Sequence, residues 1–256
     1  MPKGNRGGRR TAATTTATAA TILSNVPTNA QPMTDAQADA LRQQQDSMYD
    51  ASTTAAVKMY ISDTDFDKDG HSLSQTMNYL LDNGVDLDNA DVNTLNKQYG
   101  LRLTARDLAS MQYTNNYMQV AMHNLGQDTV LQRGAHDDML KNAFGINDYS
   151  KLTQAQLQQR LVGQSFQTDS YMSTSYDINK NPFLGKGSAV AGGREVVYNI
   201  KAGANTKCLF GAKKQSEIIL DKGTQFKITG VRYNGNAATP RGKGMKPQIV
   251  IDIETI

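Results

Sequence analysis

The sequence predicts an α+β fold, with a helical N-terminal lobe and a β-rich C-terminal lobe. Residues 34–125 contain apolar side chains at helical spacing, and helix-capping residues precede them. Residues 126–256 contain short β-prone segments that glycine-rich turns separate. Helices and strands are segregated along the chain, so we expect an α+β domain rather than βαβ units.

The composition limits the classes of protein to which this chain can belong. With 256 residues and 38% hydrophobic content, it can bury one good core and a second, smaller lobe. No apolar run approaches the roughly 18 residues that span a bilayer, so we expect a soluble protein without a membrane partner. The net charge of +3 is too small to identify a nucleic-acid-binding protein by itself.

Cysteine and histidine are too sparse to predict a disulfide framework or a metal centre. The single cysteine, Cys208, excludes an internal disulfide and fits a reducing compartment. The 3 histidines lie far apart and show no metal-ligand spacing. We therefore expect no bound metal, and a Cys–His nucleophile pair is disfavoured.

Residues 1–33 are predicted to form a disordered tail. Basic residues lie among glycines as far as Arg10, and a threonine- and alanine-rich tract without aromatic residues follows. The tract is too polar for the hydrophobic segment of a signal peptide. A flexible tail is favoured over a nucleic-acid-binding arm, because so few positive charges provide only modest affinity for phosphate.

Residues 34–125 are predicted to form the helical lobe. Thr34 with Gln37, and Ser72 with Gln75, have the spacing of capping boxes, which satisfy the first N–H groups of a helix. Methionines at helical spacing in this lobe are expected to be core residues rather than ligands. The predicted helical segments are Thr34 to Tyr60 as one or two helices, Ser72 to Gly84, and Thr104 to Leu125.

The acidic segment Asp63 to Gly70 is similar in spacing to a calcium-binding loop. With Asp65 as the first ligand, Asp67 and Asp69 occupy the next ligand positions. The twelfth position is Thr76, which cannot supply the bidentate carboxylate that such a loop requires. An acidic turn before the next helix is therefore favoured over a calcium site.

Residues 126–256 are predicted to form the β-rich lobe, with a helix near Met139 and a short one from Thr153 to Val162. Thr153 and Gln156 again have the spacing of a capping box. The predicted strands are Thr129 to Arg133, Ser170 to Tyr176, Glu195 to Ile200, Ser216 to Leu220, Gln225 to Val231, and Gln248 to Ile253.

The segment Lys213 to Ile228 contains a candidate reaction site. It is predicted to place two strands around a turn at Asp221-Lys222-Gly223. Residues two apart on an extended chain face the same way, so Gln215 and Glu217 would point together into one space. A carboxylate paired with an amide at the mouth of a sheet can do chemistry, although such a glutamate taken alone is usually just solvated.

Three short motifs follow one another on predicted strands: Leu131-Gln-Arg133-Gly134, Ser173-Thr174-Ser175 and Gln215-Ser216-Glu217. In this order they resemble the toxin-type mono-ADP-ribosyltransferases, whose pattern is an arginine, an S-T-S strand and a glutamate in E-x-E or Q-x-E. Gly163 to Ser175 looks like the family's lead-in to its second strand, and Glu217 to Ile228 looks like its glutamate strand and following turn. The resemblance covers roughly residues 55–256 and extends to chains encoded by phages and prophages.

This resemblance implies the fold and the activity. The implied fold is mono-ADP-ribosyltransferase-like, with the helical lobe (34–125) packed on a core of two small, mostly antiparallel β-sheets (126–256), which form the NAD-binding catalytic lobe. The implied substrate is NAD, whose ADP-ribose passes to a host macromolecule. That reaction takes place in the host cytoplasm, with delivery from a phage particle and virion association as part of the same expectation.

The resemblance also assigns roles to individual residues. Glu217 would stabilise the sugar cation that forms when nicotinamide leaves, and would hold the ribose 2′-hydroxyl. Arg133 would grip the pyrophosphate of NAD with paired hydrogen bonds. Ser173 would orient Glu217 and the ribose. The implied catalytic residues are Glu217, Gln215 and Ser173, and the implied NAD-binding residues are Arg133, Gly134, Ser173, Thr174, Ser175 and Phe183.

Two further segments are expected to contact substrates. The loop between Ser175 and Arg194 corresponds to one that closes over NAD, so Phe183 could stack on a ring and Lys186 could reach phosphate; a plain mobile loop is an equal alternative. Phe210 to Lys214 would form the target-recognition turn. Gln215 places the chain in the Q-x-E branch, whose members modify asparagine, other side chains or guanine bases, since a neutral amide does not attract a guanidinium.

Each of these residues alone would be an ordinary surface charge or strand hydroxyl. Their joint placement favours an ADP-ribosyltransferase that acts on a non-arginine protein side chain or on nucleic acid. Two alternatives stay open. One is an NAD glycohydrolase, with water as acceptor, and the other is a phage structural or packaged protein that uses the fold for assembly.

Overall fold

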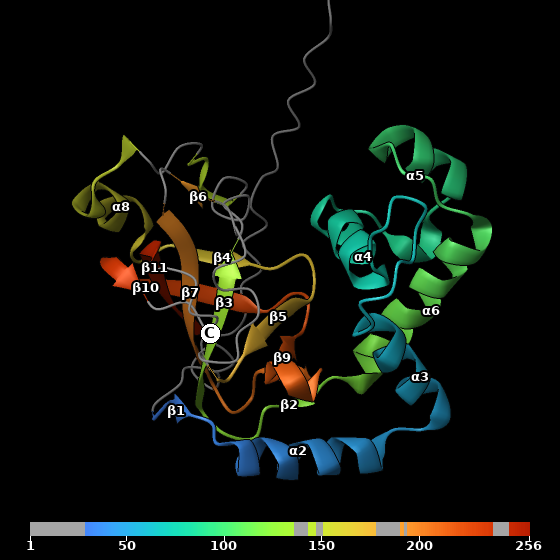
Figure 1. Ribbon diagram of the computed structural model, residues 1–256, viewed down its shortest axis with the longest axis horizontal. Helices are drawn as coiled ribbons and strands as arrows, with labels where there is room; N and C mark the ends of the chain where they lie inside the picture. The colour runs from blue at the N-terminus through green and yellow to red at the C-terminus, as the bar shows by residue number, and fades with distance from the viewer. Residues whose placement is uncertain (1–28, 136–142, 147–150, 178–189, 192–193, 238–245) are drawn as a thin grey trace, which may run out of the picture.

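The described part of the chain covers residues 29–135, 143–146, 151–177, 190–191, 194–237 and 246–256 of a computed structural model. Helices and strands are segregated in space as well as in sequence, with α3 to α6 beside the strands (Figure 1). The helices are α2 (Asp35–Met48), α3 (Ala51–Tyr60), α4 (Leu73–Asp82), α5 (Val92–Tyr99), α6 (Ala105–Ala121) and α8 (Gln154–Leu161), with 3-10 turns η1 (Leu87–Asn89) and η4 (Lys213–Gln215). The strands are β1 (Gln31–Pro32), β2 (His123–Asn124), β3 (Thr129–Ala135), β4 (Ser165–Gln167), β5 (Met172–Ser175), β6 (Val190–Ala191), β7 (Arg194–Ala202), β8 (Lys207–Phe210), β9 (Glu217–Leu220), β10 (Gln225–Ala237) and β11 (Lys246–Thr255). The predicted α+β class is confirmed.

The helices begin where the sequence predicts. Thr34, Ser72 and Thr153 each form a complete capping box with the glutamine three residues later. The segment 34–60 divides into two helices because Asp50 caps α3 through a hydrogen bond from the backbone N–H of Thr53. Helix α5 has no counterpart among the predicted segments.

The strands follow one hydrogen-bonded path, β2-β8-β9-β5-β3-β7-β11-β10-β4, with β1 added to β3 and β6 added to β7. Neighbours are mostly antiparallel; the pairs β1–β3 and β7–β11 are parallel. Strands β3 and β5 share the pair Gln132–Ser175, which joins a half containing β8, β9 and β5 to a half containing β3, β7, β11 and β10. The two expected sheets are therefore two halves of a continuous path.

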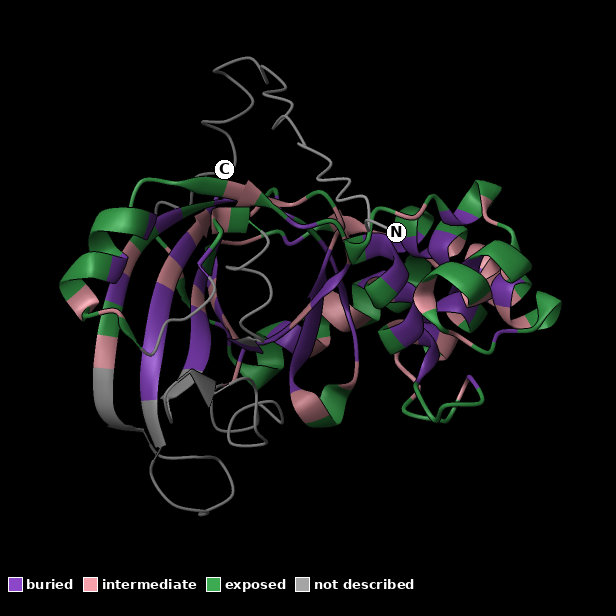
Figure 2. Cartoon of the chain, turned by 90° about the horizontal axis from the view of Figure 1, so that it is seen from above, coloured by how far each residue is buried: buried purple, intermediate pink, exposed green. Residues whose placement is uncertain are grey.

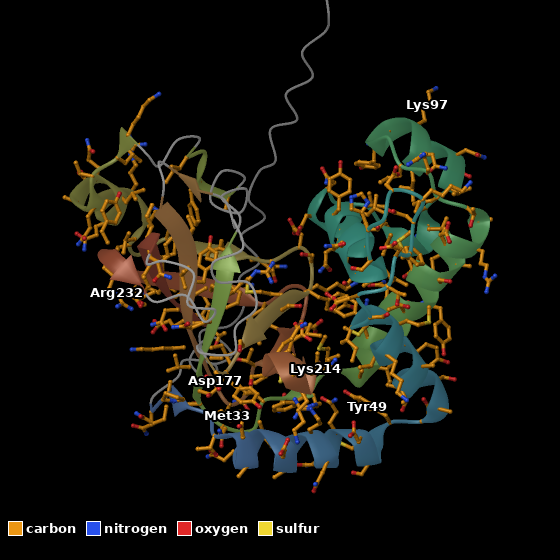
Figure 3. The ribbon with its side chains drawn as sticks, in the orientation of Figure 1. Met33, Tyr49, Lys97, Asp177, Lys214 and Arg232 are labelled. Carbon is orange, nitrogen blue, oxygen red and sulfur yellow. The ribbon has the colours of Figure 1, made fainter. Side chains whose placement is uncertain are left out.

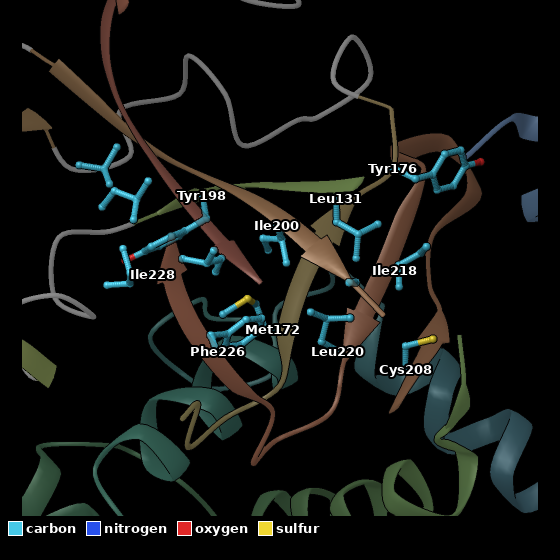
Figure 4. Close-up of a cluster of buried hydrophobic side chains, with 14 of the residues drawn as sticks. Leu131, Met172, Tyr176, Tyr198, Ile200, Cys208, Ile218, Leu220, Phe226 and Ile228 are labelled. Atoms are coloured by element: carbon cyan, nitrogen blue, oxygen red, sulfur yellow. The ribbon is translucent and has the colours of Figure 1, made fainter. Parts of the chain in front are cut away.

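Two hydrophobic cores organise the molecule, and strand alternation divides their residues. The main core lies among the strands (Figure 4) and includes Leu131, Tyr198, Ile218 and Leu220. The second core belongs to the helices α3 to α6, and Leu209 and Ile219 from strands and Tyr171, just before β5, complete it. Figure 2 shows the corresponding pattern, with strands largely buried and helices buried along one side. Since the pleat alternates, β9 presents one face to each core.

Helix α2 connects the N-terminal segment to the rest of the structure. It runs along one edge of the strands, with Met33 and Tyr49 at its two ends (Figure 3). Gln45 on this helix donates from Nε2 to the carbonyl of Phe210 at 3.1 Å and accepts from the N–H of Phe210 at 2.6 Å. These two hydrogen bonds to the strand backbone hold α2 against β8.

The predicted tail boundary at residue 33 is wrong. Gln31 and Pro32 pair with β3 in parallel, and Met33 is 5% exposed within the main core. Apolar burial and strand pairing therefore order the last residues of the expected tail. The rest of the tail, residues 1–28, lies outside the described residues.

The acidic segment Asp63 to Gly70 forms a turn between α3 and α4. The Asp67 carboxylate accepts hydrogen bonds from the backbone of Asp69 and His71 and from the hydroxyl of Thr76. Within the described ranges there is no group of three or more His, Cys, Asp or Glu side chains that could hold a metal ion. None of the described helices is long and apolar enough to cross a bilayer.

Candidate active site

The candidate site lies on the face of β5 and β9 that is turned toward the helical lobe. Ile218 and Leu220 point into the main core, whereas Ile219 packs with the helices. Strand alternation places Glu217 on the same face as Ile219, and the pairs Ser173–Ile219 and Ser175–Glu217 place Ser173 on that face as well. Ser173 and Glu217 are thus diagonal neighbours across an antiparallel pair.

Glu217 is the central carboxylate of this face. It is 7% exposed, and its Oε2 accepts a hydrogen bond from the backbone N–H of Ala212 at 2.8 Å. The hydroxyl of Ser173 also donates to this carboxylate. Burial raises the pKa of Glu217, and the hydrogen bonds from Ala212 and Ser173 together with the charge of Arg133 oppose that rise. The carboxylate is therefore held in place but not saturated with donors.

Arg133 meets the same group of residues from β3. Its Nη1 donates to the backbone carbonyl of Ser173 at 2.6 Å. Burial lowers the pKa of the guanidinium, and the nearby Tyr60, Asp82, Tyr198 and Glu217 counteract this. The guanidinium carries further N–H donors besides the one that Nη1 gives to Ser173, and its planar arrangement suits an anion.

The three hydroxyls of the S-T-S motif have different hydrogen-bond partners. Ser173 faces Glu217, as described above. Thr174 is 1% exposed and donates to the carbonyl of Ile218 at 2.6 Å. Ser175 donates to the carbonyl of Gln215 at 3.0 Å. The hydroxyls of Thr174 and Ser175 are engaged inside the protein, which favours a supporting role for them over the predicted direct contact with NAD.

Gln215 does not lie on a strand. The prediction that strand alternation points its side chain the same way as that of Glu217 is therefore wrong. Gln215 ends the 3-10 turn η4, and Ser216 adopts a left-handed backbone with φ of 50° before β9 begins at Glu217. The alternation of an extended chain therefore does not apply to this pair. The half-buried Gln215 is close to the site because its carbonyl is tied to Ser175.

Gly134 and Phe183 are the remaining residues predicted to contact NAD, and the structure describes only the first of them. Gly134 is buried on β3 directly after Arg133 and pairs with Val197 of β7. Phe183 lies outside the described residues, and so does Lys186. Their predicted contacts with NAD stay predictions.

The helical lobe adds residues to this site that the sequence pattern does not reveal. Tyr60, at the end of α3, is 2% exposed and accepts a hydrogen bond from Nδ2 of Asn78 at 2.9 Å. Burial raises the pKa of Tyr60, and both Glu217 and Arg133 influence it, which places its hydroxyl near both. Asp63, in the loop after α3, contributes to the raised pKa of Glu217. Tyr60 belongs to the apolar pattern of α3 and Asp63 to the acidic segment 63–70, and neither pattern indicates a place in this site.

Known proteins resemble this chain in sequence pattern and in fold. The family model for the ADP-ribosyltransferase exoenzyme matches residues 117–255, a range that contains Arg133, Ser173 and Glu217. No curated protein sequence matches the chain.

Solved structures with a similar fold come from bacterial toxins. The C3 exoenzyme of Clostridium limosum is 15% identical, with a TM-score of 0.56, and the match covers 90% of this chain and 98% of that one. The enzymatic component C2-I of the Clostridium botulinum C2 toxin is 15% identical, with a TM-score of 0.57, and the match covers 87% of this chain and 48% of that one. C3stau2 from S. aureus, solved with NAD, is 13% identical, with a TM-score of 0.51, over 90% of this chain and 99% of that one.

Proposed function

This chain belongs to the ADP-ribosyltransferase exoenzyme family, and we propose that it cleaves the nicotinamide–ribose bond of NAD and transfers ADP-ribose to a host macromolecule. The proposed acceptor is a non-arginine side chain of a protein, or nucleic acid. The observation that carries the proposal is a continuous contact between three motifs that lie far apart in the sequence. Arg133 donates to the backbone of Ser173, and the hydroxyl of Ser173 donates to Glu217.

The reaction separates charge at the anomeric carbon of the ribose. The bond between this carbon and the nicotinamide nitrogen breaks, nicotinamide leaves with the electron pair, and the sugar becomes an oxocarbenium-like cation. A lone pair of the acceptor then forms the new bond, and the acceptor gives up a proton. Glu217 supplies a negative charge whose interaction strengthens as the cation develops, which is what a catalytic group must do.

Arg133 is suited to hold the pyrophosphate of NAD. A guanidinium offers paired donors in one plane, and that of Arg133 lies beside Ser173 on the strand next to Glu217's partner strand β5. Its charge would keep the dinucleotide fixed on β3 while Glu217, across β5, meets the ribose. The NAD complex of the relative C3stau2 supports NAD as the donor substrate.

The turn beside Glu217 supports the choice of acceptor. Gln215 contributes a neutral residue to the turn beside Glu217, and Lys213 and Lys214 are exposed on the same turn. A neutral or cationic edge does not attract the guanidinium of an arginine acceptor, so an amide, a hydroxyl or a base is favoured. Since both NAD and such acceptors are present there, we place the activity in the host cytoplasm; delivery from a phage particle stays a prediction.

Labelled NAD tests the proposal. The full chain is incubated with NAD that carries a label in its adenosine part, together with host lysate, beside Glu217→Ala and the control Glu254→Ala. Glu254 is a strand glutamate on β11, away from Ser173 and Arg133. We expect label on macromolecules with the wild type and Glu254→Ala, and a loss of about 10³-fold with Glu217→Ala. Mass spectrometry of the labelled species then identifies the acceptor.

The other outcomes separate the alternatives. Free ADP-ribose without labelled macromolecules would identify an NAD glycohydrolase. Neither product would favour a structural role for the fold. Labelling that persists undiminished in Glu217→Ala would remove Glu217 from the catalytic role.

A further inference from the structure

The turn that precedes Glu217 is closed on itself by its own backbone. The N–H of Gly211 donates to the carbonyl of Glu217 at 3.1 Å, and the N–H of Glu217 donates to the carbonyl of Ala212 at 3.3 Å. Between these two points, the N–H of Gln215 donates to Ala212 and the N–H of Ser216 donates to Lys213, both at 3.0 Å. The first and last residues of the turn are therefore fixed next to each other.

The side chain of Glu217 folds back over this turn. Its Oε2 accepts from the N–H of Ala212 at 2.8 Å, so the carboxylate lies above the residues where the turn begins. A side chain with several rotatable bonds needs such a contact to hold one position. The direction of the carboxylate thus depends on what surrounds Gly211 and Ala212.

Gly211 provides the space that the carboxylate occupies. A Cβ atom on Gly211 would lie 2.2 Å from Oε2 of Glu217, 2.8 Å from its Cδ and 3.0 Å from its Cγ. These separations are far inside van der Waals contact, where carbon atoms prefer about 3.5–4.0 Å. Any residue other than glycine at this position must displace the carboxylate.

The backbone of Gly211 does not itself require glycine. Glycines with positive φ in the described residues include Gly70, Gly100 and Gly223, where the left-handed region explains the residue, and Gly211 is not among the positive-φ glycines. Its missing side chain is used by Glu217 instead.

We infer that Gly211 is a positioning residue for the proposed reaction, because the absence of its side chain sets the direction of the Glu217 carboxylate. The inference rests on the proposed function of Glu217. Alanine at this position would push the carboxylate off the N–H of Ala212 and away from Ser173. A displacement of about 1 Å is enough to lower the rate of a positioned reaction by about 10²-fold. Arg133 is on another strand, so binding of NAD should change little.

The test is a double-mutant cycle with two readouts. Gly211→Ala is made in the full-length wild type and in Glu217→Ala, and both kinetics of nicotinamide release and thermal unfolding are measured. We expect kcat to fall by about 10- to 100-fold in Gly211→Ala, with KM for NAD changed by less than about threefold. We also expect Gly211→Ala to lower the melting temperature of the wild type but not that of Glu217→Ala, where the clashing carboxylate is gone.

Gly230→Ala is the matched control. Its Cβ would approach Oδ2 of Asp252 at 3.2 Å, a tight contact with a carboxylate that takes no part in the site. Its effect on the melting temperature should be the same with and without Glu217, and kcat should not change.

Two results would overturn the inference: an unchanged kcat in Gly211→Ala, or an equal loss of melting temperature in both backgrounds. A wild type that cleaves no NAD would instead refute the proposed function, while the unfolding cycle would still decide whether Gly211 makes room for the carboxylate. If Gly211→Ala does not fold, recovery of folding in Gly211→Ala/Glu217→Ala supports the clash, and failure of both variants contradicts it.

Discussion

Two turns of this molecule are each organised by a carboxylate with the same exposed fraction. Asp67 in the turn 63–70 and Glu217 after the turn 211–216 are both 7% exposed. Their pKa values nevertheless move in opposite directions, since that of Asp67 is lowered and that of Glu217 is raised. The exposed fraction alone therefore does not distinguish the two sites, and the carboxylate of Glu217 is the more deeply enclosed of the two.

Hydrogen bonding distinguishes them as well. Burial would raise the pKa of Asp67, but donors to both of its oxygens outweigh it: the N–H groups of Asp69 and His71 reach Oδ1 at 2.9 and 3.0 Å, and the hydroxyl of Thr76 reaches Oδ2 at 2.9 Å. Glu217 has Ala212 and Ser173, which do not compensate for burial.

The number of donors separates two kinds of buried carboxylate. A carboxylate whose lone pairs are used by donors of its own turn and of the residues that follow it stabilises this part of the chain and has little capacity for a substrate. A carboxylate that is fixed in direction but short of donors can respond to a cation that forms beside it. Asp67 is of the first kind and Glu217 of the second.

Removal of Asp67 should give the largest effect on stability. We expect Asp67→Ala to lower the free energy of unfolding by about 2–4 kcal/mol, because it leaves several donors of the turn without their partner. Asp65→Ala, an exposed aspartate of the same turn, should stay within about 0.5 kcal/mol of the wild type.

Denaturant unfolding measures these differences, and NAD cleavage per folded molecule should be unchanged in both variants. If Asp65→Ala destabilised the protein as much as Asp67→Ala, the saturated carboxylate would not be what holds this turn together. Lost activity in folded Asp67→Ala would end the division into structural and functional carboxylates.

In the turn 211–216, replacement of Ser216 by glycine should change the free energy of unfolding by less than Asp67→Ala does, and should increase it. Ser216 has a φ of 50°, in the left-handed region, its side chain is fully buried, and its hydroxyl has no hydrogen-bond partner in the part of the chain that the structure describes. We expect Ser216→Gly to raise the free energy of unfolding by about 1 kcal/mol, because glycine adopts this φ without strain.

Ser216→Ala serves as its control, since alanine removes the hydroxyl and keeps the Cβ. The difference between the two variants in denaturant unfolding isolates the strain of the backbone. If Ser216→Gly were no more stable than Ser216→Ala, the left-handed backbone of the serine would be unstrained.

The sequence contains the periodic features of the fold and the motifs of the site, but not the contacts that direct them. Capping boxes and strand alternation are local, so α2, α4, α8, β3 and β5 were predictable. The short β8 has no clear alternation and exists because β2 and β9 pair with it on either side. It places Phe210, predicted as the start of the recognition turn, at the end of a strand.

The same limit applies to the candidate site. Arg133, Ser173 and Glu217 could be named from ordered motifs, because their residue types are what the chemistry requires. The backbone reversal at Ser216 could not be predicted, since nothing in Gln-Ser-Glu favours a left-handed serine and the hydrogen bonds of the closed turn impose it. Gly211 could not be recognised either, because its role is a contact through space with a residue further along the chain.

The pH dependence of stability should give the smallest effect and the sharpest comparison. The folded-state pKa of Glu217 lies above its ordinary value of 4.5, so the proton binds the folded state more tightly, and this stabilising contribution is present at low pH and lost as pH rises through the raised pKa. Glu217→Gln should therefore be more stable than the wild type at neutral pH, with a difference that vanishes in acid.

Asp67→Asn should show the reverse pH dependence of stability. The lowered pKa of Asp67 stabilises the wild type above the ordinary value of 3.8, and this advantage is lost as pH falls through the lowered pKa. Unfolding curves of the three proteins between acid and neutral pH measure both trends. Parallel pH profiles for the two variants would show that the two carboxylates do not differ in the way that their hydrogen bonds indicate.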